Sequence, residues 1–346
     1  MKAAVFLGPE KIEVRDVEKP NPKEGEVLLK VAVCAICGTD VRIYYKGQKN
    51  VVPPHIMGHE IAGTVEELGA GVTGIKSGER VVIVTSVGCG ECQFCKKGLH
   101  NLCLSYRAIG YAFPGGFAEY MLIPKEAVAQ GNLLPVPARL SSEEASLVEA
   151  LSCCINGQKY LNISRGDVVV IFGAGPIGCM HIELARQKGA SKIILINFQS
   201  QSRLDLAKRF KADLYLSSSK EDPVKRVLEE TSGQGADVII TACSAKIAQE
   251  QAIRMANKNA RISFFAGIPK DDPYIKLDSN EIHYKEICVF GAFASYRSQF
   301  EEAVELIASR RVDARKFLTH EFPLDDIVKG IETAKSGDAL KVIIKP

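Results

Sequence analysis

The order of apolar and polar positions along the chain changes near residue 140. Up to about Pro137 the chain has short alternating or β-branched runs, such as Val27 to Ala32 and Ile61 to Glu66, which Gly and Pro separate. Alternation with a period of two is typical of half-buried strands. This first part of the chain therefore predicts a β-rich domain.

After Ser141 the pattern predicts helices and strands in turn. Helices are expected from about Ser142 and from Pro176 to Lys188, and Ser298 to Ser309 repeats apolar residues at helical spacing. The expected strands are Val168 to Phe172, Lys192 to Ile196, Asp237 to Thr241, Ala260 to Phe265 and Glu286 to Phe290. This alternation indicates a parallel, doubly wound α/β sheet. A last strand, Leu340 to Ile344, is assigned with its flanking tail to the first domain.

A glycine-rich turn follows the first strand of the second part. Gly173, Gly175 and Gly178 have the G-x-G-x-x-G spacing of dinucleotide-binding turns. The first glycine permits the turn, the second lets a pyrophosphate approach the backbone, and the third lets helix and strand pack closely. The amino end of the following helix attracts phosphate groups. The sequence therefore predicts a nicotinamide dinucleotide site, with further contacts at Pro176, Ile177, Ala266, Gly267 and Ile268.

The second anchor of such a site departs from the usual pattern. An acidic residue about 20 positions beyond the glycines binds the ribose hydroxyls, and here that position is Phe198. Its polar neighbours are Asn197, Ser200, Ser202 and Arg203. Without a carboxylate, Arg203 and a serine can bind a 2′-phosphate, which favours NADP over NAD. Alternatively, Asn197 bonds the ribose of NAD and Arg203 stacks on the adenine.

Four of the eleven cysteines lie close together in the sequence. They are Cys89, Cys92, Cys95 and Cys103. Four thiolates on one short segment suit tetrahedral zinc, and a site with four protein ligands has no position left for substrate. This pattern predicts a structural zinc that couples metal binding to local folding. The alternative is a set of free thiols or a redox pair.

A second metal-binding group can be assembled from separate motifs. Cys37 opens Cys-Gly-Thr-Asp, His59 and Glu60 follow Gly58, and Glu149 lies further along the chain. Thiolate, imidazole and carboxylate form a three-ligand set for a catalytic zinc that keeps one position open. Zinc in such a site lowers the pKa of an alcohol. The hydroxyl of Thr39 is placed to pass the alcohol proton toward solvent, or is simply a helix cap.

Taken together, these motifs resemble the zinc-containing medium-chain dehydrogenases of the alcohol, sorbitol and threonine dehydrogenase group. The resemblance covers essentially the whole chain and also includes the Gly-Gly-Phe-Ala-Glu-Tyr run of residues 115–120. It implies a GroES-like catalytic domain from residues 1–149 and 294–346, and a Rossmann domain from residues 150–293. It also implies two zincs per chain, bound NADP or NAD, and a homo-oligomer, either a tetramer or a dimer.

The resemblance assigns roles to the second group. It implies that Cys37 and His59 bind the catalytic zinc and that Glu60 approaches the metal and can exchange with water. Glu149 matches the position where polyol dehydrogenases carry a glutamate, which favours a polyol or sugar alcohol as substrate. Arg42 departs from the family, because sorbitol and threonine dehydrogenases usually have a histidine there. This weakens the threonine interpretation and brings an acidic or phosphorylated sugar alcohol into consideration. Alternatively, Arg42 is a surface residue or a contact to the cofactor phosphate.

Composition narrows the remaining classes of function. The 346 residues suit two domains, and 46% hydrophobic with 25% charged residues is ordinary for a soluble protein. A net charge of +3 without charged blocks argues against nucleic acid and membrane and favours a small-molecule substrate. Charges at Glu10, Glu13 and Arg15 interrupt any signal-peptide run, so a cytoplasmic location is expected. The alternatives are an L-threonine or simple secondary alcohol dehydrogenase, and a non-catalytic, redox-responsive nucleotide-binding protein.

Overall fold

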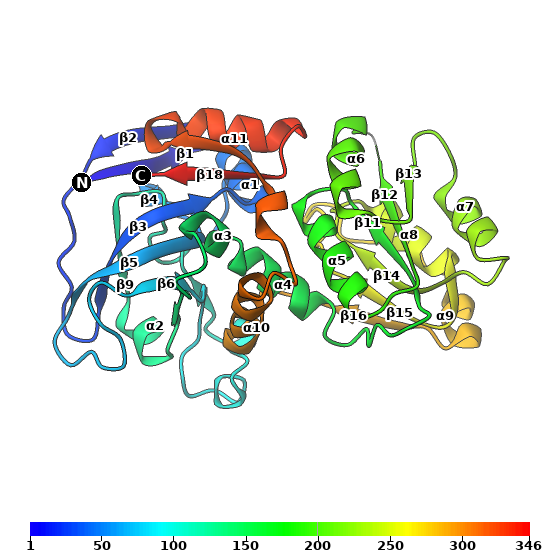
Figure 1. The fold of residues 1–346 in the computed structure, drawn as a ribbon, viewed down its shortest axis with the longest axis horizontal. Coiled ribbons are helices and arrows are strands. Elements are labelled where there is room, and N and C mark those ends of the chain that lie inside the picture. Colours follow the sequence, from blue (N-terminus) through cyan, green and yellow to red (C-terminus); the bar gives the residue numbers. More distant parts are fainter. Residues whose placement is uncertain (199) are drawn as a thin grey trace. The chain divides into compact units, whose positions relative to one another are not determined.

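The computed structural model describes residues 1–198 and 200–346, which form two compact units. Unit 1 consists of Met1–Ser152 and Ala294–Pro346, and unit 2 of Cys153–Phe293 (Figure 1). The first boundary falls within helix α4 (Val148–Gly157), slightly beyond the expected residue 149. Each unit has its own sheet and its own hydrophobic core.

Unit 1 is built around a seven-stranded sheet. Its order is β10-β6-β5-β3-β18-β17, and β9 also pairs with β3. These strands are β3 (Val27–Ala35), β5 (Glu60–Leu68), β6 (Arg80–Ile83), β9 (Tyr120–Ile123), β10 (Leu133–Pro135), β17 (Leu318–Pro323) and β18 (Lys341–Lys345). A three-stranded sheet contains β1 (Lys2–Gly8), β2 (Lys11–Asp16) and β4 (His55–Ile56). A two-stranded sheet contains β7 (Ser86–Val87) and β8 (Arg107–Ala108). The predicted β-rich domain is confirmed.

The helices of unit 1 are short or come from the end of the chain. Its α-helices are α1 (Gly38–Lys46), α2 (Lys125–Ala129), α3 (Ser142–Ser146), the start of α4, α10 (Arg297–Ala308) and α11 (Ile327–Ser336). Its 3₁₀ helices are η1 (Cys95–Lys97), η2 (His100–Leu102), η4 (Ala314–Lys316) and η5 (Leu324–Asp326). The helix expected over Ser298 to Ser309 is α10, one residue earlier at each end.

Both ends of the chain meet in the sheet of unit 1. Strand β3 lies between β5 and β18 (Figure 1). Ala35 of β3 pairs with Glu60 of β5 on one side and with Ile343 of β18 on the other. Ile344 is fully buried in the same core as Val27 and Leu29. Burial of the last strand against one of the first explains why the tail belongs to unit 1.

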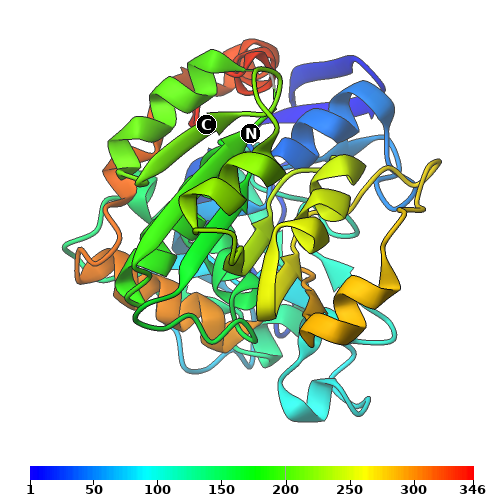
Figure 2. The same ribbon diagram turned by 90° about the vertical axis from the view of Figure 1, so that its right-hand side faces the viewer.

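Unit 2 is a parallel sheet with helices on both faces. The sheet order is β13-β12-β11-β14-β15-β16, and all pairs are parallel. The strands are β11 (Val168–Phe172), β12 (Lys192–Asn197), β13 (Leu214–Ser217), β14 (Ala236–Thr241), β15 (Ala256–Phe264) and β16 (Cys288–Gly291). The helices are α5 (Pro176–Gln187), α6 (Gln201–Ala207), α7 (Pro223–Glu230), α8 (Lys246–Arg254) and α9 (Ser279–Lys285), with η3 (Lys208–Phe210) after α6. Figure 2 shows helices on both sides of the sheet, which confirms the predicted doubly wound architecture.

Two details of unit 2 differ from the sequence prediction. β13 was not predicted, because it is short and only Leu216 in it is fully buried. β15 begins earlier than expected, at Ala256, because the strand continues through an irregularity in its pairing with β14. Asn259 takes a left-handed conformation there, with φ of 58°, which asparagine tolerates better than most residues.

No helix among the described residues is long and apolar enough to cross a bilayer.

Candidate active site

A thiol, an imidazole and a carboxylate meet in unit 1. One ligand atom each of Cys37, His59 and Glu60 lies within 4.8 Å of the other two. Cys37 is half-buried ahead of α1, whereas His59 and Glu60 are buried where β5 begins. These three predicted residues are therefore brought together from separate segments. Their donor set fits a zinc ion with one open coordination position.

Asp40 holds the imidazole and the thiol in place. The backbone N–H of Cys37 donates to Oδ2 of Asp40 at 2.9 Å, which caps the first turn of α1. Oδ1 of Asp40 faces Nδ1 of His59 at 3.5 Å, an ion-pair distance, and within the described residues neither buried atom has a hydrogen bond to any other group. A carboxylate behind a ligand imidazole fixes its tautomer and leaves the other nitrogen for the metal. The N-cap of α1 is Cys37, so the alternative that Thr39 caps this helix is wrong; Thr39 lies inside the helix and is half-buried there.

The electrostatics around His59 favour a positive charge. Burial alone lowers the pKa of His59, but Tyr111, Asp40 and Cys37 outweigh it and raise that pKa well above its usual value. A proton or a metal ion can supply the positive charge that these neighbours stabilise. The site therefore suits a cation on physical grounds.

Glu60 is held by a buried lysine. Both of its carboxylate oxygens accept hydrogen bonds from Nζ of Lys341, and the two residues are 281 positions apart in the sequence. Both side chains are almost completely buried, at 2% and 0% exposure. Burial opposes the lysine charge, but Glu60 together with Cys37 and Glu149 outweighs burial and raises the pKa of Lys341 to about 12. The predicted metal ligand Glu60 is thus anchored away from solvent in this structure.

Glu149 approaches the same region from the first turn of α4. It is half-buried, and its charge acts on Tyr111 and on Lys341. It does not belong to the described group whose ligand atoms lie within 4.8 Å of one another. Arg42 lies further along α1, is exposed, and donates to Oε1 of Gln48 at 2.8 Å.

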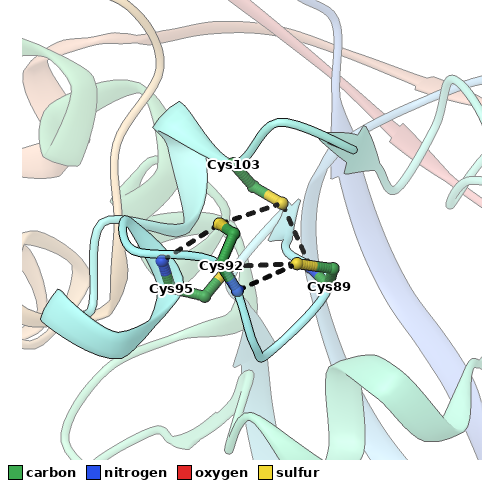
Figure 3. Close-up of side chains that lie close together, drawn as sticks. All are labelled: Cys89, Cys92, Cys95 and Cys103. Atoms are coloured by element: carbon green, nitrogen blue, oxygen red, sulfur yellow. Dashed lines mark hydrogen bonds between the residues drawn. The ribbon is translucent and has the colours of Figure 1, made fainter.

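The four-cysteine lobe forms a second group. Ligand atoms of Cys89, Cys92, Cys95 and Cys103 all lie within 4.8 Å of one another, and Figure 3 shows their side chains converging. Backbone N–H groups point at the sulfurs: that of Cys89 donates to Cys103 at 3.2 Å, and that of Cys92 to Cys89 at 3.4 Å. The N–H of Cys95 is the main cause that lowers the pKa of Cys92 to about 6. The pKa of Cys89 is lowered in the same way, whereas burial raises the pKa of Cys95 to about 12. Four converging sulfurs fit a tetrahedral zinc with no open position.

The glycine turn of unit 2 leaves space only for glycine at two places. Gly173 has φ of +104°, and a Cβ there would meet the carbonyl of Ala242 at 2.8 Å. A Cβ on Gly178 would lie 1.8 Å from the carbonyl oxygen of Gly173. At Gly175, which caps α5, the nearest atom to a Cβ is Nη1 of Arg203 at 3.8 Å. The loop thus leaves open backbone at the amino end of α5, which fits a pyrophosphate.

The polar cluster after β12 lies beside this turn. Oδ1 of Asn197 accepts from the backbone N–H of Ala174 at 3.3 Å, and its Nδ2 donates to the carbonyl of Ser200 at 2.9 Å. Ser200 caps α6 by accepting from the backbone of Arg203, and it also bonds Ser202 at 2.9 Å. The half-buried Arg203 therefore places its cation next to the glycine turn.

The other predicted cofactor residues also lie at the carboxyl edge of the parallel sheet. Pro176 and Ile177 form the first turn of α5. Ala266, Gly267 and Ile268 follow β15, and Ala266 donates to the carbonyl of Thr241 at the end of β14. Phe198 is 53% exposed, so its ring does not belong to the core.

Sequence reasoning missed two residues near the metal-binding group. Lys341 and Lys345 flank the apolar run of β18, and a lysine that is buried there needs a partner for its charge. The sequence does not tell which of the two is buried. Tyr111, whose hydroxyl lies 3.5 Å from Nε2 of His59, gave no signal in the sequence, because it comes from a loop after β8.

Comparison with known proteins places these features in a family context. The family model of the alcohol dehydrogenase GroES-like domain matches residues 23–138, and that of the zinc-binding dehydrogenase matches residues 176–309. The chain is 33% identical to a sorbitol dehydrogenase of Halalkalibacterium halodurans, over 100% of this chain and 99% of the relative. It is 35% identical to an L-threonine 3-dehydrogenase of Bacillus subtilis, over 96% and 94%.

A solved structure has the same arrangement of elements. It is a zinc-binding dehydrogenase of Sinorhizobium meliloti bound to NADP, with a TM-score of 0.92 and 29% identity over 100% of this chain and 99% of that one. The likeness extends over both units of the chain.

Removing one lobe cysteine should remove one metal. We expect Cys92→Ser to lower the zinc content by about one ion per chain and to lower the melting temperature, because a structural zinc contributes folding free energy. Atomic absorption and thermal unfolding would measure both. Cys288→Ser, at an exposed cysteine outside the lobe, is the matched control. Unchanged zinc content in Cys92→Ser would contradict the assignment.

Breaking the buried ion pair should destabilise the protein strongly. We expect Lys341→Met to lower the free energy of unfolding by about 3–5 kcal/mol, because it leaves the carboxylate of Glu60 buried without a partner. Lys345→Met, which removes a partly exposed pair with Glu143, should cost at most about 1 kcal/mol. Denaturant unfolding measures both values. The double variant Lys341→Met/Glu60→Gln should recover part of the loss; equal small effects at both lysines would argue against a buried pair.

Proposed function

The chain belongs to the zinc-containing medium-chain dehydrogenase family, and from this premise we propose that it oxidises a secondary hydroxyl of a polyol or sugar alcohol with NADP or NAD. The observation that carries the proposal is the convergence of Cys37, His59 and Glu60 within 4.8 Å. A binding protein without catalysis has no need of a metal site with an open position. Similarity to dehydrogenases over the full length favours an enzyme as well.

The residues divide the chemistry among them. Cys37 and His59 would hold the catalytic zinc, with Glu60 and Glu149 as the further carboxylates of the site. Zinc bound there acts as a Lewis acid that favours loss of the alcohol proton. A bound nicotinamide would accept the hydride of the carbinol carbon, and the hydroxyl of Thr39 would pass the hydroxyl proton toward solvent, which together convert the alcohol to a ketone. Asp40 orients His59 throughout, at 3.5 Å from its Nδ1.

The polyol assignment rests on Glu149. A second carboxylate near the metal group favours substrates with several hydroxyls, because each carboxylate accepts hydrogen bonds. Full-length similarity to a sorbitol dehydrogenase supports the same class. L-threonine is the second candidate, favoured by the similarity to a threonine dehydrogenase. The homo-oligomer and the cytoplasmic location expected from the sequence stay predictions.

A substrate panel tests the proposed function. Purified, zinc-loaded protein would be assayed by the absorbance of reduced cofactor with polyols, aldonic acids, amino alcohols and simple secondary alcohols. We expect the highest kcat/KM with a polyol and no turnover by Cys37→Ala, while Cys288→Ala keeps the activity. Circular dichroism should show that Cys37→Ala remains folded. Highest activity with L-threonine would replace the proposal by the second candidate, and full activity of folded Cys37→Ala would refute the metal site.

The preferred cofactor is tested at Arg203. The position of its guanidinium next to Gly175 supports NADP as the better cofactor. We expect Arg203→Ala to raise the KM for NADP by about tenfold or more, because a charge-assisted hydrogen bond is lost, and to change the KM for NAD little. Arg254→Ala, at an exposed arginine of α8, is the control. A tenfold preference of the wild-type protein for NAD would contradict the NADP proposal.

A further inference from the structure

Tyr111 lies against the metal-binding group on a tightly held loop. Its hydroxyl is 3.5 Å from Nε2 of His59, and the two ring centroids are 5.1 Å apart. The preceding Gly110 has φ of +82°, and a Cβ there would lie 2.7 Å from the carbonyl oxygen of Gly58. The backbone N–H of Gly110 donates to the carbonyl of Phe113 at 2.9 Å. The loop is therefore pressed onto the segment that carries His59.

The hydroxyl of Tyr111 faces the imidazole nitrogen to which a metal would bind. Nδ1 of His59 faces Asp40, so Nε2 is the ring nitrogen left for coordination. A coordinated nitrogen has no lone pair left to accept a hydrogen bond. Once a metal is bound, the hydroxyl of the half-buried Tyr111 is free to donate to another acceptor at the site.

Tyr111 has no role in the chemistry described above. The charges of Cys37, Asp40 and Glu149 all act on its hydroxyl, which places this group among the polar residues of the site. Among the described residues, the hydroxyl of Tyr111 lies within hydrogen-bond distance of Nε2 of His59. When substrate binds at the metal, one of its oxygen atoms can accept this hydrogen bond from Tyr111.

We propose that Tyr111 determines specificity by donating a hydrogen bond from its hydroxyl to the substrate hydroxyl next to the one being oxidised. The inference rests on the proposed function and deepens it, since it names vicinal diols as the substrate class. The two oxygens of a vicinal diol sit on adjacent carbons. When one of these oxygens occupies the open coordination position beside His59, the other lies close enough to accept a hydrogen bond from Tyr111, whose hydroxyl is next to Nε2 of His59.

The test compares two alcohols that differ by one hydroxyl. Butane-2,3-diol and butan-2-ol would be assayed with zinc-loaded wild-type protein, Tyr111→Phe and the control Tyr120→Phe, a tyrosine of β9. Tyr111→Phe should lower kcat/KM for the diol by about tenfold and leave that for butan-2-ol within about twofold, because one neutral hydrogen bond is lost. Tyr120→Phe should change neither value.

A second measurement separates substrate binding from support of the metal. Zinc content and the visible spectrum of the cobalt-substituted protein should be the same for Tyr111→Phe and wild type, while titration with the diol should shift the spectrum at about tenfold higher concentration in Tyr111→Phe. Equal losses for both alcohols, a loss of zinc, or no change for the diol would each overturn the proposal. If the wild-type protein oxidises no alcohol of the panel, the proposed function itself fails and this inference falls with it.

Discussion

The buried ion pair between Glu60 and Lys341 is the contact on which the arrangement of unit 1 depends. It joins strand β5, near the start of the chain, to strand β18 at its end. The pairing of Ala35 with both Glu60 and Ile343 puts the two strands on either side of β3 and brings the charges into register. Because neither charge is exposed, each stays buried only while the other is present. The ion pair with Lys341 thereby helps to position Glu60 in the metal-binding group.

The two candidate metal groups differ in where their ligands come from in the sequence and in whether a coordination position stays open. The four-cysteine lobe draws its ligands from fifteen consecutive positions, 89–103, and surrounds the sulfurs with backbone N–H groups. Its geometry is local and complete, which suits a structural role. The group of Cys37, His59 and Glu60 comes from separate segments and is supported from behind by Asp40 and Lys341. A supported but incomplete ligand set suits catalysis, because one position remains for an exchangeable ligand.

In unit 2 the constraint is steric. Side chains are excluded at Gly173 and Gly178 by backbone atoms that are already in place, whereas Gly175 faces open space next to Arg203. The fold itself therefore requires glycine at positions 173 and 178. At position 175 glycine leaves the backbone accessible to a ligand. A cation beside open backbone at the start of α5 is a favourable environment for phosphate groups.

The sequence by itself determined whatever depends on local spacing. The doubly wound sheet, the glycine turn, the four-cysteine lobe and the family resemblance all follow from patterns within a few tens of residues. Only the tertiary structure decided which distant groups meet. No spacing relates Lys341 to Glu60 or Tyr111 to His59, because these contacts arise from strand order and from a loop folded onto β5. The weak strand β13 was missed for a related reason, since its place is set by pairing with β12 rather than by its own pattern.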